Sequence, residues 1–90
     1  MKTKNYLLCY DISDAKRLAK LAKMVEKEAY RIQNSIFLLL EPTQAELHHI
    51  IVEVAKIIDK EKDDVRIYTI KNSGYLVGIA TNLDEPFILI

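Results

Sequence analysis

The stretch RIQNSIFLLL, residues 31–40, decides how many strands this chain of 90 residues contains. Residues 32–40 are mostly apolar, and polar Gln33 and Ser35 alternate with them at the start, as in a strand that is half covered at one end. The run is long enough for one bent strand or for two strands that form a hairpin. The pattern of residues leaves both arrangements open, and they lead to different folds.

A strand and a helix are predicted before this stretch. Residues 5–11 form a short aromatic and apolar run, typical of a buried strand, and residues 12–14 follow as a turn. Apolar residues then recur every three or four positions from Ala15, which predicts a helix with Ser13 or Asp14 as its N-cap. The apolar stripe of this helix consists of Leu18, Leu21, Ala22, Val25 and Ala29.

A second helix and two strands are predicted after it. Glu41-Pro42-Thr43 breaks the strand, and Thr43-Gln44-Ala45-Glu46 is a capping box that opens a helix. The apolar stripe of this helix consists of Leu47, Ile50, Ile51, Val54, Ile57 and Ile58. Residues 65–70 and 75–80 should form a hairpin around the loop 71–74, and the apolar segment 87–90 is left over.

The order of these elements is βαβαββ if residues 32–40 form one strand, and the ferredoxin-like βαββαβ if they form two. In both arrangements the helices cover one face of the sheet. The other face, on which we place Tyr6, Tyr68 and Tyr75, needs a cover, and a homodimer packed sheet to sheet would supply it. Since the sequence contains no repeat or linker, we predict one α+β domain spanning residues 1–90.

The composition is that of a soluble globular protein. Half of the residues are hydrophobic and 29% are charged, which argues against a disordered or membrane-embedded chain. No apolar run approaches the roughly 18 residues of a membrane span, and the N-terminus lacks the pattern of a secretory signal. We therefore expect a cytoplasmic protein without membrane contact. The single cysteine, Cys9, cannot form an internal disulfide, and we assign it no chemical role.

Positive charge gathers in the first third of the chain although the net charge is zero. Residues 1–34 hold eight Lys/Arg and four acids, whereas residues 35–90 hold five and nine. Four lysines at helical spacing would form one positive face of the first helix, here called the lysine ridge: Lys16, Lys20, Lys23 and Lys27. Such a ridge suits phosphate groups, and a merely solvated helix face is the alternative.

Two arginines are further candidates for phosphate binding. Arg17 and Arg31 offer the bidentate geometry that lysine lacks, and surface ion pairs with Glu26 or Glu28 are the alternative. The adjacent His48 and His49 cannot share a ligand face on a helix, so a two-histidine metal site is not expected. The sequence shows no nucleophile triad and no glycine-rich phosphate loop.

Asp11 lies at the exit of the first predicted strand, where packing gives no reason for an acid. It either accepts backbone N–H groups of the turn or serves a charged ligand. Asp14 fits a helix cap better than a ligand. Tyr10 should point to the opposite face of the strand from Asp11 and pack there. For Phe37, packing in the core is the first interpretation and stacking on a base is the second.

Three short segments, spread in order over most of the chain, carry a resemblance to a known family. They are Tyr10–Asp14 with Lys16 and Arg17, Arg31–Phe37 (RIQNSIF), and Asp63–Tyr68 (DDVRIY). In these segments the sequence resembles the CRISPR-associated protein 2 family of small CRISPR adaptation proteins. The resemblance implies an α+β, ferredoxin-like βαββαβ fold with an additional C-terminal strand. It also implies a symmetric homodimer in which the C-terminal segment 81–90 pairs with the sheet of the partner subunit.

The resemblance further implies a metal-dependent endonuclease for RNA or DNA that works with a CRISPR-associated integrase in spacer acquisition. Asp11 would be the catalytic residue, and with its copy across the two-fold axis it would hold Mg²⁺ or Mn²⁺. Lys16, Arg17, Lys20, Lys23, Lys27 and Arg31 would contact the nucleic acid, with Tyr10, Asp14 and Phe37 as secondary candidates. Two alternatives remain: a non-catalytic, nucleic-acid-binding dimeric scaffold for the integrase, and a related toxin-type ribonuclease.

Overall fold

The computed structural model describes residues 4–70 and 88–90. Within these ranges the elements are β1 (Asn5–Asp11), α1 (Ala15–Glu26), β2 (Tyr30–Gln33), β3 (Ile36–Leu39), α2 (Gln44–Ile57), β4 (Asp64–Ile70) and β5 (Ile88–Leu89). The first six follow the βαββαβ order of ferredoxin-like folds, and β5 is an additional C-terminal strand. The predicted α+β fold class is therefore confirmed.

The stretch 31–40 forms two strands, so the single bent strand and the βαβαββ order are wrong. β2 and β3 pair as an antiparallel hairpin in which Gln33 lies opposite Ile36. Asn34 and Ser35 form the turn, and both residue types favour turns because their side chains bond local backbone. The turn is fastened to β1, because Tyr10 donates its backbone N–H to the Ser35 carbonyl at 3.1 Å and its hydroxyl to the Asn34 carbonyl at 2.9 Å.

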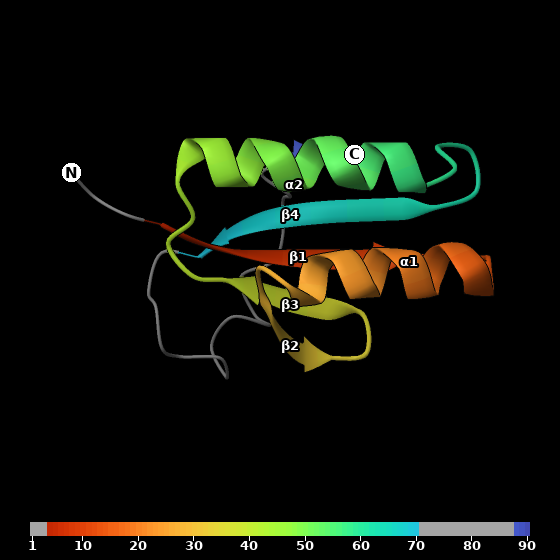
Figure 1. Cartoon of the computed structure of the whole chain (residues 1–90), viewed down its shortest axis with the longest axis horizontal. Coiled ribbons are helices and arrows are strands. Elements are labelled where there is room, and N and C mark those ends of the chain that lie inside the picture. Colours follow the sequence, from red (N-terminus) through yellow and green to blue (C-terminus); the bar gives the residue numbers. More distant parts are fainter. Residues whose placement is uncertain (1–3, 71–87) are drawn as a thin grey trace.

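The described strands form one antiparallel sheet in the order β2-β3-β1-β4-β5. Figure 1 shows α1 and α2 side by side on the same face of this sheet. β1 lies in the middle, and its Leu8 is opposite Phe37 of β3 and Ile67 of β4. All three side chains are fully buried, so the centre of the core lies where these strands meet the helices.

The two faces of β1 have different neighbours. Tyr6, Leu8 and Tyr10 belong to the core under the helices, so the alternating residues point to the opposite face, here called the far face. The placement of Tyr6 on the uncovered face is therefore wrong, because Tyr6 shares the side of Leu8. Tyr68 lies opposite Leu7 in the register and is on the far face as predicted, whereas Tyr75 lies outside the described residues.

Both helices begin at the predicted caps. Asp14 accepts the backbone N–H of Arg17 at 2.9 Å and is the N-cap of α1. Thr43 and Glu46 form a complete capping box at the start of α2, with bonds of 2.8 and 3.1 Å. α1 ends at Glu26, earlier than the apolar pattern predicts, and Ala29 packs against the core from the connection to β2.

Residues 88–90 pair with β4 of the same chain. β5 is antiparallel to β4, and Ile90 donates its backbone N–H to the Val65 carbonyl at 2.9 Å. The pairing of segment 81–90 with a partner subunit stays a prediction. The predicted strand 75–80, its hairpin loop 71–74 and Phe87 lie outside the described residues. In the described ranges no helix is long and apolar enough to span a membrane.

Candidate functional site

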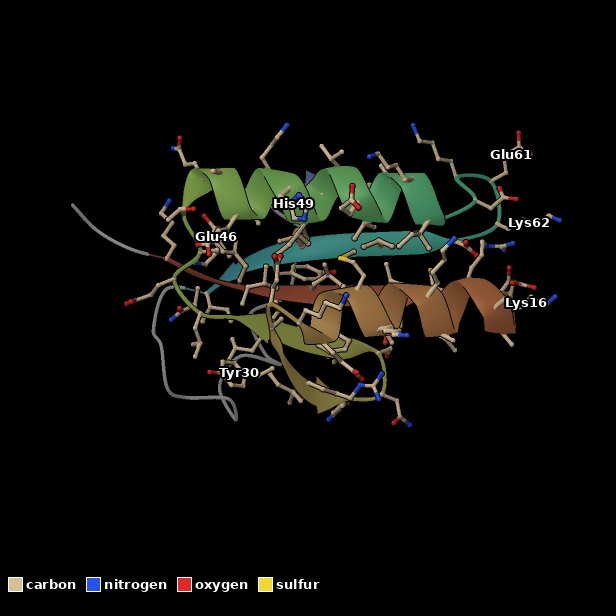
Figure 2. All side chains as sticks on the ribbon, viewed as in Figure 1. Lys16, Tyr30, Glu46, His49, Glu61 and Lys62 are labelled. Atoms are coloured by element: carbon tan, nitrogen blue, oxygen red, sulfur yellow. The ribbon has the colours of Figure 1, made fainter. Side chains whose placement is uncertain are left out.

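Two connections meet at one end of the molecule: the turn from β1 to α1 and the segment between α2 and β4 (Figure 1). The register of the sheet places Asp11, the last residue of β1, opposite Asp64, the first residue of β4. Figure 2 shows Lys16, Glu61 and Lys62 at this same end. The end therefore carries both signs of charge, and it includes the residue predicted to perform the chemistry.

A buried carboxylate, Asp63, holds these connections together. It accepts the backbone N–H of Ser13 at 3.0 Å, the Ser13 hydroxyl at 3.2 Å and the backbone N–H of Asp59 at 2.8 Å. Arg17 donates Nε to Oδ2 at 2.8 Å and Nη2 to Oδ1 at 3.2 Å. The bonds from Arg17, together with those from the Asp59 and Ser13 backbone, hold the pKa of Asp63 well below its usual range.

Asp11 has none of these structural duties. Its side chain is exposed, and within residues 4–70 and 88–90 its carboxylate makes no hydrogen bond or ion pair. The backbone N–H of Ser13 is bound by Asp63, and that of Arg17 by Asp14. The interpretation of Asp11 as a turn-stabilising acid is therefore wrong for the described part of the chain, whereas Asp14 is the helix cap that we expected.

Asp63 and Asp64 are the residues that sequence reasoning missed as parts of the site: Asp63 directly precedes β4, and Asp64 is its first residue. Asp64 is half-buried and bonds Arg66 at 3.0 Å, and both residues lie on the far face with Asp11. A signal was present in the sequence. Two acids stand directly before a buried strand, where packing gives no reason for a carboxylate, just as it gives none for Asp11 at the end of β1.

The lysine ridge is exposed. Lys16, Lys20 and Lys23 belong to α1, and Lys27 is its C-cap. All four side chains are exposed, and none forms an ion pair with the residues that the structure describes. Their charges are therefore available to a phosphate backbone, and they are equally compatible with a solvated helix face.

The two arginines predicted to contact phosphate are both engaged with protein groups. Arg17 uses Nε and Nη2, one of the two edges of the guanidinium suited to bidentate bonding, on Asp63. Arg31 lies 3.5 Å from Glu26 and 5.2 Å above the centroid of the Phe37 ring. Arg31 therefore forms the surface ion pair with Glu26 that was the alternative to phosphate binding. Arg17 has a different partner from either glutamate that we considered.

Tyr10 and Phe37 are core residues. Phe37 is fully buried, and its ring centroid lies 6.0 Å from that of Tyr10 in a stacked arrangement. The Tyr10 hydroxyl is occupied by the Asn34 carbonyl. Tyr10 thus lies on the opposite face of β1 from Asp11, as predicted. Tyr10 and Phe37 both pack in the core, which was the first interpretation of each.

The remaining metal-binding residue types do not assemble into a site. His48 and His49 are exposed on α2, where Figure 2 labels His49. Burial raises the pKa of the half-buried Cys9 thiol, which disfavours the reactive thiolate. The described residues contain no group of three or more His, Cys, Asp or Glu side chains placed to hold a metal ion. In residues 4–70 and 88–90, one chain therefore offers the carboxylate of Asp11 without a complete set of metal ligands around it.

Comparisons with known proteins point to one family. The family model described as CRISPR associated protein Cas2 matches residues 4–76. "CRISPR-associated endoribonuclease Cas2 2" of Thermodesulfovibrio yellowstonii is 40% identical over 82 residues, which cover 89% of each chain. Streptococcus pyogenes Cas2 superimposes with a TM-score of 0.69 at 30% identity, covering 79% of this chain and 89% of that chain.

A chain of the solved structure titled "Partial Cas6-RT-Cas1--Cas2 complex" is also similar, with a TM-score of 0.68 and 28% identity. The match covers 77% of this chain and 75% of that chain. The family model alone spans more than half of the sequence, and it includes the exit of β1 with Asp11 and the start of β4 with Asp63 and Asp64. This chain belongs to the CRISPR-associated Cas2 family.

Proposed function

We propose that this protein is a CRISPR adaptation protein that acts in the cytoplasm as a homodimeric, metal-dependent endonuclease within the spacer-acquisition machinery. The observation that carries the nuclease assignment is the exposure of Asp11 and the lack of bonds to its carboxylate within the described residues. Its carboxylate is exposed and unengaged within the described residues, while Asp14 and Asp63 stabilise the same turn. An acid with no structural duty at a crowded end of the fold is best explained by a ligand.

Asp11 fits a divalent metal by its chemistry. Mg²⁺ and Mn²⁺ prefer oxygen ligands, and one or two carboxylates with water and substrate phosphate commonly hold Mg²⁺. In a two-fold dimer packed through the far face, Asp11 would meet its copy, and a shared cation would relieve their repulsion. The bound metal would polarise a phosphodiester or make a bound water more acidic, and Asp11 would hold it in place.

Nucleic acid binding rests on the lysine ridge. Phosphate contacts need positive charge at the right spacing. One exposed helix face offers it, without competing ion pairs in the described residues, through Lys16, Lys20, Lys23 and Lys27. Such contacts serve RNA and duplex DNA alike. The relative from Thermodesulfovibrio yellowstonii is named an endoribonuclease, which supports RNA as the first substrate to test.

A second candidate function is a non-catalytic scaffold. The similar chain of the Cas6-RT-Cas1–Cas2 complex supports assembly with a CRISPR-associated integrase. One unengaged carboxylate per chain also provides few ligands for the metal that phosphodiester hydrolysis would need. In this function the dimer would bind DNA for the integrase, and Asp11 would be dispensable. The family assignment gives no support to the toxin-type ribonuclease alternative.

The deciding experiment compares the wild-type protein with Asp11→Ala on labelled single-stranded RNA and duplex DNA, in Mg²⁺, Mn²⁺ or chelator. The nuclease proposal expects cleavage that requires both the metal and Asp11, and the substrate that is cut identifies its class. Salt-sensitive binding without cleavage in either protein, with co-purification of the integrase unaffected by Asp11→Ala, would establish the scaffold instead. Cleavage that persists in Asp11→Ala would show that the catalytic residue lies elsewhere.

A further inference from the structure

The carboxylate of Asp63 has an environment that is unusual for a charged group. Its side chain has no exposed surface, and the N–H and O–H donors around its two oxygens favour the ionised form. Burying a charge is costly unless the group is paired and fully hydrogen-bonded. Asp63 therefore depends on its partners, and they in turn are held where its two oxygens require them.

Most of these partners come from a distant part of the sequence. Asp63 accepts five hydrogen bonds, of which four come from Ser13 and Arg17, 46 to 50 residues earlier in the chain. The fifth comes from the backbone of Asp59 and closes the connection between α2 and β4. Arg17 also donates Nη2 to the Ser13 hydroxyl at 3.2 Å, so the three side chains form one closed network. This network fastens the turn after β1 to the start of β4.

The fastened turn begins two residues after Asp11. The sheet register holds the backbone of Asp11 opposite Asp64, and the bond from the Ser13 N–H to Asp63 holds the chain just beyond it. The Asp11 carboxylate has no bond of its own within the described residues. Its direction is consequently set through its backbone, and the backbone is held by the neighbouring turn. Ligand side chains generally need such supporting contacts to keep a productive geometry.

We propose that Asp63 is the positioning residue for Asp11, acting through Ser13, and that Arg17 serves this turn as the counter-ion of Asp63 and does not bind phosphate. The inference rests on the proposed role of Asp11. It changes the assignment of Arg17, because one bidentate edge of the guanidinium, Nε with Nη2, is bound to a carboxylate that compensates its charge. Phosphate binding is then left to the lysine ridge.

The positioning role is tested with Mn²⁺ alone, by the electron paramagnetic resonance signal of free Mn²⁺ in titrations of the dimeric protein. Asp63→Asn keeps the shape of the side chain but removes its charge, and it should weaken Mn²⁺ binding by about tenfold or more. Val54→Ala is the control, because it destabilises the core under α2 without touching the turn. Equal Mn²⁺ affinity in Asp63→Asn and wild type, or an equal loss in folded Val54→Ala, would overturn the proposal.

A milder variant covers the case in which Asp63→Asn does not fold. Ser13→Ala removes only the hydroxyl contacts of an exposed residue, so it should fold and weaken Mn²⁺ binding by a smaller factor. Wild-type Mn²⁺ affinity in Ser13→Ala would then count against the proposal. Because these measurements need no cleavage, a protein that binds Mn²⁺ at Asp11 but does not cut would fail the nuclease assignment and still decide the role of Asp63.

The assignment of Arg17 is tested by the salt dependence of duplex DNA binding. Each phosphate contact contributes about 0.9 to the slope of log K against log salt. Arg17→Gln should keep the wild-type slope, because Arg17 is occupied by Asp63, whereas Lys20→Gln should lower it by about 0.9. A fall of this size in Arg17→Gln would show that Arg17 contacts phosphate and would overturn this part of the proposal.

Discussion

Three aspartates around one turn differ in role because they differ in environment. Asp14 caps α1, Asp63 is buried and ionised in a network of donors, and Asp11 is exposed with a carboxylate unengaged within the described residues. Sequence reasoning predicted the cap from its position before the helix and the direction of Asp11 from strand alternation. It missed the network of Asp63, because contacts between residues 46 to 50 positions apart leave no trace in spacing.

The ionised state of Asp63 predicts how stability responds to acid. Its pKa is low in the folded chain and returns to roughly 3.9 on unfolding, so below that pH the unfolded chain binds more protons. The contribution of Asp63 is therefore complete above about pH 5 and is lost progressively as the pH falls further. We expect the gap in Tm between wild type and Asp63→Asn to narrow from about pH 5 to pH 2 in thermal melts.

Other charged groups face this site and need a control. Asp14 and Asp59 also lie close enough to Arg17 to interact with its charge. Asp14→Asn, measured over the same pH range, is the control for the loss of a different carboxylate from this turn. A gap in Tm between wild type and Asp63→Asn that stays constant to pH 2 would contradict the structural role of the ionised carboxylate.

Tyr10→Phe tests whether Tyr10 is a packing residue. The change removes the hydrogen bond from the hydroxyl to the Asn34 carbonyl and should cost about 1 kcal/mol in the free energy of unfolding. Nucleic acid binding should be unchanged, because Tyr10 is buried under the helices. Tyr30→Phe is the matched control on exposed β2 (Figure 2) and should be neutral in urea denaturation. Weakened nucleic acid binding in Tyr10→Phe would return Tyr10 to the candidate site.

At the scale of elements, the helices were predictable and the hairpin of β2 and β3 was not. The capping box and apolar stripe of α2 are local patterns, and the structure contains them as predicted. The hairpin of β2 and β3 depends on a turn at Asn34 and Ser35 that is completed by bonds to Tyr10, a residue far away in the sequence. A local pattern therefore left one strand or two as open alternatives, and tertiary contact decided between them.

The connection from β3 to α2 contains a position with left-handed backbone. Glu41 has a φ of 44°, and its backbone N–H bonds the side chain of buried Asn5 at 2.8 Å. Glu41→Gly and Glu41→Ala remove the same side chain, but only glycine adopts this φ without strain. We expect the Gly variant to be more stable than the Ala variant by about 1 kcal/mol in urea denaturation. Equal stability would contradict a constrained left-handed conformation.

The lysine ridge predicts how one helix contributes to nucleic acid binding. A double substitution, Lys20→Gln with Lys23→Gln, should reduce the slope of log K against log salt by nearly 2 for duplex DNA, as measured by fluorescence anisotropy. Lys56→Gln on α2 is the control, because Lys56 is exposed and pairs with Glu53 at 3.1 Å. If Lys56→Gln alone lowers the slope as each ridge lysine does, binding is nonspecific and the ridge has no special role.

At the scale of the whole molecule, the helix side and the far face of the sheet carry different candidate functional residues. The helix side holds the core and exposes the lysine ridge, whereas the far face carries Asp11, Asp64 and Arg66 at one end of the sheet. The order of strands puts β1 in the centre, so the exit of β1 is supported by β3 and β4 on either side. Asp11 thus lies at a rigid position of the fold, which is where a metal ligand is placed best.

The most direct test of the central claim compares Asp11→Asn with Asp14→Asn in cleavage of labelled RNA and duplex DNA with Mg²⁺ or Mn²⁺. Both variants remove one negative charge from the same turn, and asparagine caps a helix about as well as aspartate. We predict that Asp11→Asn folds as the wild type does but loses cleavage by about a hundredfold or more, while Asp14→Asn stays active. Equal activity of the two variants would contradict a catalytic role for Asp11.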